Sequence, residues 1–302
     1  MNSFIITPYI KGSLLVAFFI FLSPSIKSSK GDINILTNVP FIILAIGQSN
    51  MEGRFGSDLD DESVKGDVFA WNSKSQKFEF AKLGVPPFGG NAGGFGGKAN
   101  NLALRFGIRV HENTGRPVRI LLFAVGGKQI EYFLPTDILV ENELAYDDNK
   151  PHSRFGESLG DEIFGEENEI SKALSTIGQR HVDVVLVHQG EANVVVGDST
   201  ESLINKYSIF LEELGNMDYT QKSTPVIFGE INSRYPNAQN QRDAIRTLSV
   251  NYPFVSFVRW DGIDEVGKIE GRPGYNNHAS GLGLQQLGDR YFKVFQNEVN
   301  NQ

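Results

Sequence analysis

The stretch FIILAIGQSNM, residues 41–51, decides the expected fold. Its first six residues are all apolar, which is typical of a strand buried on both faces of a sheet. Gly47 ends the apolar run, and polar residues follow at once. Comparable runs lie further along the chain at 118–125, 182–187 and 225–231, with a weaker run at 254–258. The chain therefore contains several candidate strands for one buried sheet.

Helical patterns separate these runs. Leu102, Phe106 and Val110 are spaced by four residues, and Gly115 follows as a typical C-terminal stop. Similar apolar stripes lie at 170–177, 203–214 and 284–294. Strand and helix thus alternate, a pattern that predicts a parallel sheet with helices on both faces.

Two of the expected helices carry N-terminal capping signals. Asp198 and Glu201 have the spacing of a capping box before the stripe at 203–214. Ser280 precedes the last stripe and is expected to cap that helix. These signals indicate where the two helices begin.

Composition argues against several classes of function. Of the 302 residues, 40% are hydrophobic and 21% are charged, which fits a globular protein and not a disordered chain. The net charge of -8 argues against a nucleic-acid partner, because phosphate binding needs clustered Lys and Arg. The chain has no cysteine, which excludes disulfides, thiolate metal sites and a cysteine nucleophile.

The first residues have the pattern of a leader for export. Lys11 precedes an apolar run at 13–22, and small residues follow, as in a cleavable signal peptide. The run is too short for a good membrane span, and an uncleaved N-terminal anchor is the alternative. We therefore expect a signal peptide at 1–29 and a single domain at 30–302. The mature protein would be secreted or periplasmic, with no stable membrane span.

The residues that directly follow the strands are the candidates for a site, because ligands of open α/β sheets bind at the carboxyl ends of the strands. Gly47, Gln48 and Ser49 follow the first strand. A serine on a tight turn after a strand is pushed toward solvent, and backbone N–H groups behind it can face a developing oxyanion. Ser49 is therefore a candidate nucleophile; the alternative is a serine that only caps the next helix.

The next two strands are also followed by residues suited to a site. Gly126, Gly127 and Lys128 follow the second, where the glycines either let the backbone approach a substrate or form an ordinary loop. Gln189 and Glu191 follow the third. The amide of Gln189 can donate to an oxyanion, and Glu191 can fix the loop or orient a partner. The alternative is a polar cap on the strand.

Histidine is a common base beside a serine nucleophile, and the chain has five histidines. His188 and His278 are the two expected at strand or loop ends on the functional edge of the sheet. His278 comes directly before the last expected helix, after a loop at 261–277. We therefore expect His278 to meet Ser49 and to act as its base.

Together these motifs resemble the SGNH hydrolases. The matching strings are GQSNM at 47–51, GG at 126–127, QGE at 189–191 and the C-terminal His278. More narrowly, they resemble the sialic-acid O-acetylesterase-like branch and the acetylxylan esterases of carbohydrate esterase family six, over residues 41–295. The resemblance implies a three-layer α/β/α sandwich with a five-stranded parallel sheet, flavodoxin-like in strand order. It implies neither a metal nor an organic cofactor.

The resemblance also implies a role for each matching residue. Ser49 would be the nucleophile and His278 the general base. The backbone N–H groups of Ser49 and Gly127 and the side chain of Gln189 would form the oxyanion hole. Glu191 is counted with the catalytic residues as a candidate orienting acid. The neighbours expected to bind the substrate are Gln48, Asn50, Gly126 and Lys128.

One position departs from the family pattern. Many members carry an aspartate three residues before the histidine, and here that residue is Tyr275. A dyad oriented by a backbone carbonyl or by Asn277 is one explanation, and a degenerate site is another. Because loss of a triad acid can cost about 10⁴ in rate, the departure bears on activity more than on fold. In the third explanation the acid comes from elsewhere, and the candidates are Glu191, Asp261, Asp264, Glu265 and Glu270.

The expected function is removal of O-acetyl groups from a carbohydrate, such as sialic acid or a plant polysaccharide like acetylxylan. Two alternatives stay open. The chain could hydrolyse other small or lipid esters on the same fold, or it could be a degenerate homologue that binds sugar without turnover. Lys128, where the family commonly has a small hydroxyl residue, bears on which acyl or sugar group is accepted.

Overall fold

The computed structural model describes residues 38–53, 66–81, 100–144, 159–266 and 277–300. Several sequence predictions concern other residues. The leader expected at 1–29, the candidate acid Glu270 and the departure at Tyr275 all lie outside the described residues.

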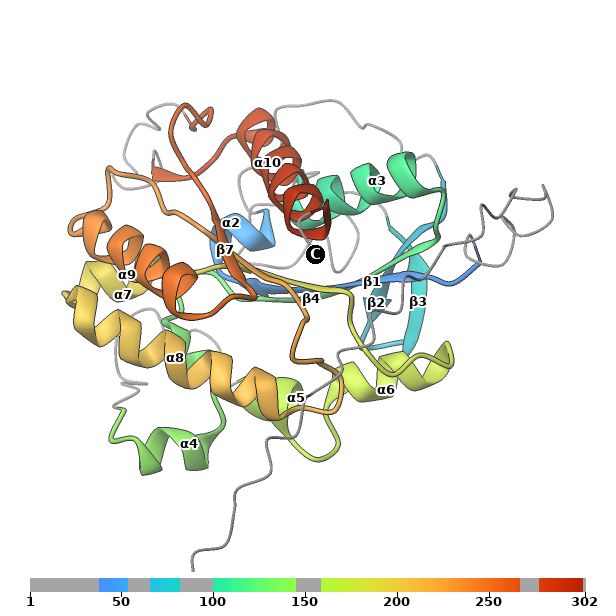
Figure 1. Ribbon diagram of the computed structural model, residues 1–302, viewed down its shortest axis with the longest axis horizontal. Coiled ribbons are helices and arrows are strands. Elements are labelled where there is room, and N and C mark those ends of the chain that lie inside the picture. Colours follow the sequence, from blue (N-terminus) through green and yellow to red (C-terminus); the bar gives the residue numbers. More distant parts are fainter. Residues whose placement is uncertain (1–37, 54–65, 82–99, 145–158, 267–276, 301–302) are drawn as a thin grey trace, which may run out of the picture.

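A seven-stranded sheet forms the middle layer of the protein (Figure 1). Its strands are β1 (Phe41–Gly47), β2 (Val68–Asn72), β3 (Lys77–Phe80), β4 (Val118–Ala124), β5 (Val184–His188), β6 (Val226–Gly229) and β7 (Val255–Val258). Their order across the sheet is β3-β2-β4-β1-β5-β6-β7. Neighbouring strands are parallel except β2 and β3, which pair antiparallel.

The expected five-stranded parallel sheet is therefore too small, and the sheet is mixed. Each of the five predicted runs contributes a strand, and these five neighbour one another in the order β4-β1-β5-β6-β7. The hairpin of β2 and β3 extends the sheet beyond β4. It was missed because it lacks a long apolar run: β3 is largely exposed and alternates Lys77, Phe78, Glu79 and Phe80.

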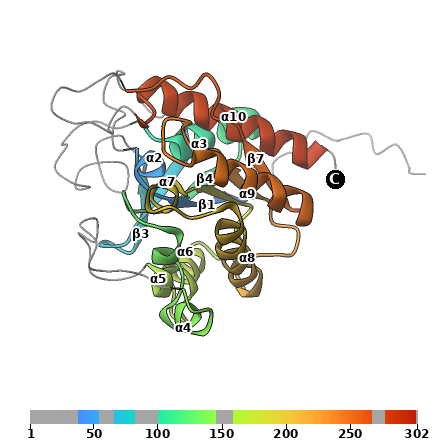
Figure 2. The same ribbon diagram turned by 90° about the vertical axis from the view of Figure 1, so that its left-hand side faces the viewer.

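Helices cover both faces of the sheet, which gives three layers (Figures 1 and 2). The long helices are α3 (Leu102–Thr114), α8 (Thr200–Asn216), α9 (Ala238–Asn251) and α10 (Gly281–Asn300). The shorter ones are α2 (Ser49–Glu52), η1 (Ile130–Phe133), α4 (Thr136–Glu141), α5 (Gly160–Phe164), α6 (Glu169–Thr176) and α7 (Glu191–Val196). In the part of the chain that the structure describes, no helix combines the length and apolarity needed to cross a bilayer.

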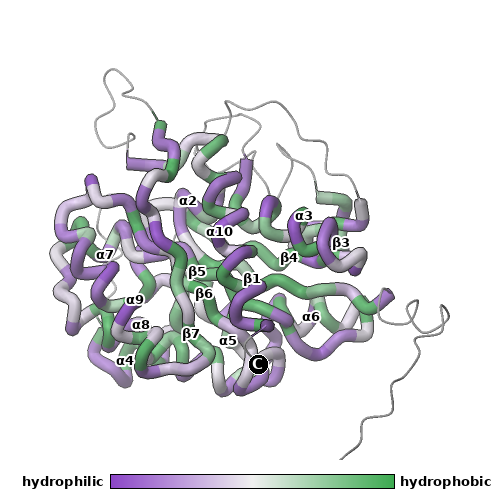
Figure 3. Tube along the Cα trace, turned by 45° about the horizontal axis from the view of Figure 1, so that its top comes forward, coloured by the Kyte–Doolittle hydropathy of each residue, from purple (hydrophilic) through white to green (hydrophobic). Residues whose placement is uncertain are grey.

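Two hydrophobic cores hold the layers together, one on each face of the sheet. Strand β1 supplies both, because its successive side chains point to opposite faces. Leu44 and Ile46 pack in one core with residues of α6, α8 and α9. Ile43 and Ala45 pack in the other with residues of α3 and α10. Figure 3 shows the hydrophobic colour along the central strands, in agreement with strands buried on both faces.

The helix boundaries confirm two of the three predicted signals. Gly115 ends α3 with a φ of 68°, and the Ser280 hydroxyl accepts from the backbone N–H of Gly283 at 3.1 Å at the start of α10. The predicted box at Asp198 is wrong by one residue, since Ser199 caps α8 through the N–H of Ser202. The carboxylate of Asp198 instead binds the ammonium of Lys206, at 2.7 Å.

The carboxyl ends of the parallel strands meet at one edge of the sheet. Gly47 at the end of β1 is in register with Ala124 of β4 and with His188 of β5. The segments that follow these strands, and the segment that follows β6, therefore begin close together in space. This edge holds the candidate site.

Candidate active site

Ser49 lies on a tight turn between β1 and α2. A Cβ atom on Gly47 would lie 2.3 Å from the carbonyl oxygen of His188 and 2.7 Å from the Cβ of Met51. No side chain fits in that space, so glycine is required for the turn to pass against β5. The turn holds Ser49 at the start of α2, where its side chain is mostly but not wholly buried, with 4% of the residue exposed.

The imidazole of His278 meets this serine. The Oγ of Ser49 and the Nε2 of His278 are 2.7 Å apart, although the residues are 229 positions apart in the chain. His278 lies just before α10, and its carbonyl accepts from the backbone N–H of Val266 at 3.0 Å. An imidazole that carries its proton on Nδ1 presents an acceptor Nε2 to the serine hydroxyl. The geometry therefore suits proton transfer from Ser49 to His278.

Asn50 lies inside the protein and not at its surface. Its Nδ2 donates to the Oε1 of Glu191 at 2.9 Å, and its Oδ1 accepts from the backbone N–H of Ala279 at 3.0 Å. Only 1% of the residue is exposed. Both ends of the amide are thus used within the protein, which does not favour the substrate contact we expected. Gln48, also expected to bind substrate, is buried as well.

Glu191 and His188 form a buried polar pair beneath the serine. Burial raises the pKa of Glu191 to about 7, although hydrogen bonds from Asn50, its own backbone N–H and Gln48 oppose the shift. Burial also lowers the pKa of His188 to about 3, so this imidazole is neutral at physiological pH. His188 therefore interacts as a dipole: its Nδ1 is 3.2 Å from the hydroxyl of Tyr291, and its Nε2 is 3.7 Å from the Oε1 of Glu191.

Gln189 connects the loop after β5 to the loop after β4. Its Nε2 donates to the backbone carbonyl of Lys128 at 2.7 Å, and its side chain is buried. Gly127 has a φ of 76°, in the left-handed region that glycine tolerates. Lys128 is buried with its ammonium 4.5 Å from the centre of the Tyr132 ring, while Gly126 is half-buried. One N–H of Gln189 thus shapes the loop.

A match to a protein-family model identifies the relatives of this chain. The model described as carbohydrate esterase, sialic acid-specific acetylesterase, matches residues 40–297. The chain belongs to this family. It is accordingly a carboxylic ester hydrolase, and the family implies an acetylated carbohydrate as substrate.

Solved structures share the fold of this esterase at low sequence identity. A protein from Arabidopsis thaliana is 18% identical with a TM-score of 0.58, over 86% of this chain and 99% of that one. The crystal structure of NanS is 13% identical with a TM-score of 0.56, over 88% of this chain and 99% of that one. A carbohydrate acetylesterase from Xanthomonas citri is 14% identical with a TM-score of 0.54, over 87% of this chain and 57% of that one. A comparison with curated protein sequences found no match.

Four of the five candidate orienting acids of the esterase fall within the described residues, and each has other partners. Glu191 accepts from Asn50, as described above. Asp264 accepts from the hydroxyl of Ser280, which is the cap of α10. Glu265 accepts from the indole N–H of Trp260 at 3.2 Å and pairs with Arg234 at 2.7 Å. Asp261 is largely exposed and lies 3.9 Å from Arg242.

Sequence reasoning overlooked the residues that follow β6. The apolar run at 225–231 predicts a strand that extends through Ile231, whereas the strand ends at Gly229. Glu230 and Asn232 therefore belong to the functional edge of the sheet, and both are buried. The signal that could have found them is the polar pair itself, which interrupts the apolar pattern on either side of Ile231.

Proposed function

We propose that this esterase removes O-acetyl groups from a carbohydrate by covalent catalysis at Ser49. The observation that carries the proposal is the 2.7 Å separation of the Ser49 Oγ from the His278 Nε2. A serine hydroxyl is a weak nucleophile until a base takes its proton during attack. His278 takes that proton, and the Ser49 oxygen forms a bond to the ester carbonyl carbon.

The negative charge that develops on the carbonyl oxygen is then stabilised by hydrogen-bond donors. We assign this role to the backbone N–H groups of Ser49 and Gly127 and to the second side-chain N–H of Gln189. Each such donor is worth about 3–4 kcal/mol of barrier in comparable sites. The bond between the carbonyl carbon and the sugar oxygen then breaks as His278 gives the proton to that oxygen, which leaves as a hydroxyl, and an acetyl group is left on Ser49. Water activated by the same histidine releases acetate and restores the serine.

The substrates we propose are O-acetylated sialic acid or an acetylated plant polysaccharide such as acetylxylan. Family membership supports the class of substrate. Among the residues expected to bind it, half-buried Gly126 is better placed for a backbone contact than the buried side chains of Gln48 and Asn50. Lys128, whose ammonium faces the Tyr132 ring, is assigned to shaping this loop.

The chemical class of the acyl group can be tested with p-nitrophenyl esters of increasing chain length. We expect the highest kcat/KM for acetate and a decline toward long chains, with acetate released from acetylated sugars. A rate that rises with chain length would instead support a lipid-type esterase. Sugar binding without any ester cleavage would support the degenerate homologue.

A further inference from the structure

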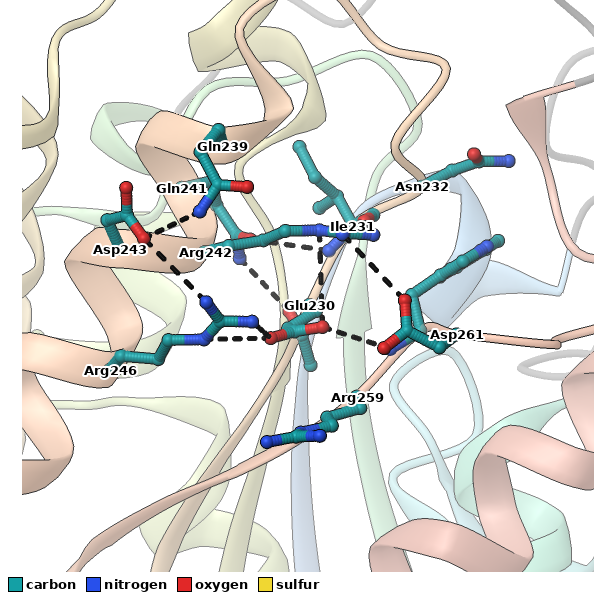
Figure 4. Close-up of polar contacts among 12 residues, drawn as sticks. Glu230, Ile231, Asn232, Gln239, Gln241, Arg242, Asp243, Arg246, Arg259 and Asp261 are labelled. Atoms are coloured by element: carbon teal, nitrogen blue, oxygen red, sulfur yellow. Dashed lines mark hydrogen bonds and ion pairs between the residues drawn. The ribbon is translucent and has the colours of Figure 1, made fainter.

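Glu230 anchors a polar network behind the loop that follows β6 (Figure 4). Its carboxylate is fully buried and accepts from Arg246 at 2.6 Å through Nη2 and at 3.2 Å through Nε. Its other oxygen accepts from the backbone N–H of Trp260 at 3.3 Å. The network therefore ties the end of β6 to α9 and to the segment that follows β7.

The next residue of the loop is held through its backbone. The N–H of Ile231 donates to the Oε1 of Gln241 at 3.3 Å, and its carbonyl accepts from the Nε and Nη2 of Arg242 at 3.2 and 3.0 Å. Both Gln241 and Arg242 lie on α9, so that helix fixes the loop on two sides. In Figure 4, Asn232 extends from the Ile231 end of the network, away from Glu230.

Asn232 links this network to residues 277–279, the histidine loop that contains His278. Its Nδ2 donates to the backbone carbonyl of Asn277 at 3.1 Å, and its Oδ1 accepts from the backbone N–H of Arg234 at 2.9 Å. The two partners fix which way the amide points, because an N–H needs the oxygen end and a carbonyl needs the nitrogen end. Asn277 is the residue directly before His278.

A second buried amide holds the other side of the same histidine. The Oδ1 of Asn50 accepts from the N–H of Ala279, the residue directly after His278. The backbone on either side of the imidazole is thus bound by an asparagine from a neighbouring strand end. Neither bond involves the imidazole itself, so both act on where the ring lies and not on its chemistry.

We propose that Asn232 is a positioning residue, which keeps the imidazole of His278 within reach of the Ser49 hydroxyl by holding the Asn277 carbonyl. The inference rests on the proposed roles of Ser49 and His278. Small displacements of a catalytic group are costly, and a shift of about 1 Å can lower a rate about 100-fold.

Asn232→Asp is the sharpest test, because it preserves shape and replaces the donor by an acceptor that the Asn277 carbonyl repels. Asn240→Asp is the matched control: its Nδ2 also donates to a backbone carbonyl, that of Asp198 at 2.9 Å, away from the histidine loop. We expect Asn232→Asp to lower kcat for p-nitrophenyl acetate about 10- to 100-fold with little change in KM. The control should retain the wild-type kcat. Asn232→Ala, which adds no charge, should behave like Asn232→Asp.

A comparison of two substrates with different leaving groups distinguishes a misplaced imidazole from a general loss of folding. His278 must protonate the departing oxygen of a sugar, whereas p-nitrophenolate leaves without a proton. A misplaced imidazole should therefore lower kcat/KM more for an acetylated sugar than for p-nitrophenyl acetate. A variant that is merely less folded loses both activities in the same proportion, and its thermal midpoint falls below that of the control.

The outcomes distinguish this inference from the proposed function on which it rests. If Ser49→Ala abolishes activity but both Asn232 variants match the control in kcat and in the ratio of the two substrates, the positioning role is overturned. If Ser49→Ala remains active, the proposed function fails first. A selective loss in both Asn232 variants, with the control unaffected, supports the role.

Discussion

Beneath the serine, the carboxyl of Glu191 is buried, and burial raises its pKa to about 7. In the unfolded chain the same carboxyl titrates near its ordinary value of 4.5. Between these values the folded protein holds a proton that the unfolded chain has lost. The contribution of this carboxyl to stability is therefore complete below about pH 4.5, and it falls as the pH rises toward 7.

Replacing Glu191 by Gln removes this titration, so a comparison with the wild type should show whether Glu191 makes stability rise or fall with pH. The free energy of unfolding of the wild type, relative to Glu191→Gln, should fall by on the order of 1–3 kcal/mol between about pH 4.5 and pH 8. Urea denaturation at the two pH values measures the difference. Glu201→Gln is the control: hydrogen bonds from its own backbone N–H and from Ser199 lower the pKa of this exposed carboxyl, so its contribution to stability is largely in place at pH 4.5 and the relative stability should not fall between pH 4.5 and pH 8. Equal differences at both pH values would contradict a buried, protonated Glu191.

At the scale of single residues, the sequence predicted which residues lie at the site, but it predicted only some of their contacts. Ser49 and His278 were expected to meet because both follow strands at one edge, and the structure places them in contact. The inward orientation of Asn50 could not be predicted, since it depends on two partners 141 and 229 positions away. Tyr275 lies outside the described residues, so the departure from the family pattern stays as the sequence presents it.

Among the elements, α3 and α10 pack especially closely on one face of the sheet. A Cβ atom on Gly288 of α10 would lie 2.6 Å from the Cβ of Arg105 and 2.7 Å from the carbonyl oxygen of Leu102, both at or near the start of α3. The pair is also joined by Asp289, whose carboxylate binds Arg105 at 2.8 Å and Arg109 at 2.7 Å. The close approach therefore depends on glycine at 288.

Gly288→Ala should separate these helices and destabilise the protein by about 1–3 kcal/mol, the usual cost of overpacking. Gly215→Ala is the matched control, because a Cβ on this glycine of α8 would have no neighbour within 4 Å. Alanine is the better helix former, so the control should gain up to about 1 kcal/mol. Denaturant midpoints measure both changes. Equal stability of the two variants would show that the packing of α3 on α10 tolerates the methyl group.

Element prediction succeeded where burial on both faces leaves a continuous apolar run, as in β1 and β5. It failed for β2, whose apolar run of four residues at 68–71 is short, and for β3, an exposed edge strand of mixed composition. The cap of α8 was misplaced by one residue, because Asp198 and Ser199 are both good caps and the other contacts of each side chain decide between them. Lys206 binds Asp198 and leaves Ser199 to cap the helix.

Across the whole molecule, the proposed chemistry needs the first strand and the start of the last helix to meet. The parallel strands of the sheet achieve this, since β1 lies at the centre of the sheet and α10 packs on one face with its first residues at the carboxyl edge. Strand alternation and helix stripes predicted this arrangement in outline. The signal peptide at 1–29 and the secreted or periplasmic location stay predictions.

The most direct measurement of the central claim is peptide mapping after reaction with a fluorophosphonate probe, which bonds to an activated serine. The account predicts one adduct, on the peptide that contains Ser49. The adduct should be absent in Ser49→Ala and form far more slowly in His278→Ala. A wild-type protein that releases acetate while its adduct maps to a different residue, or forms none, would contradict the account.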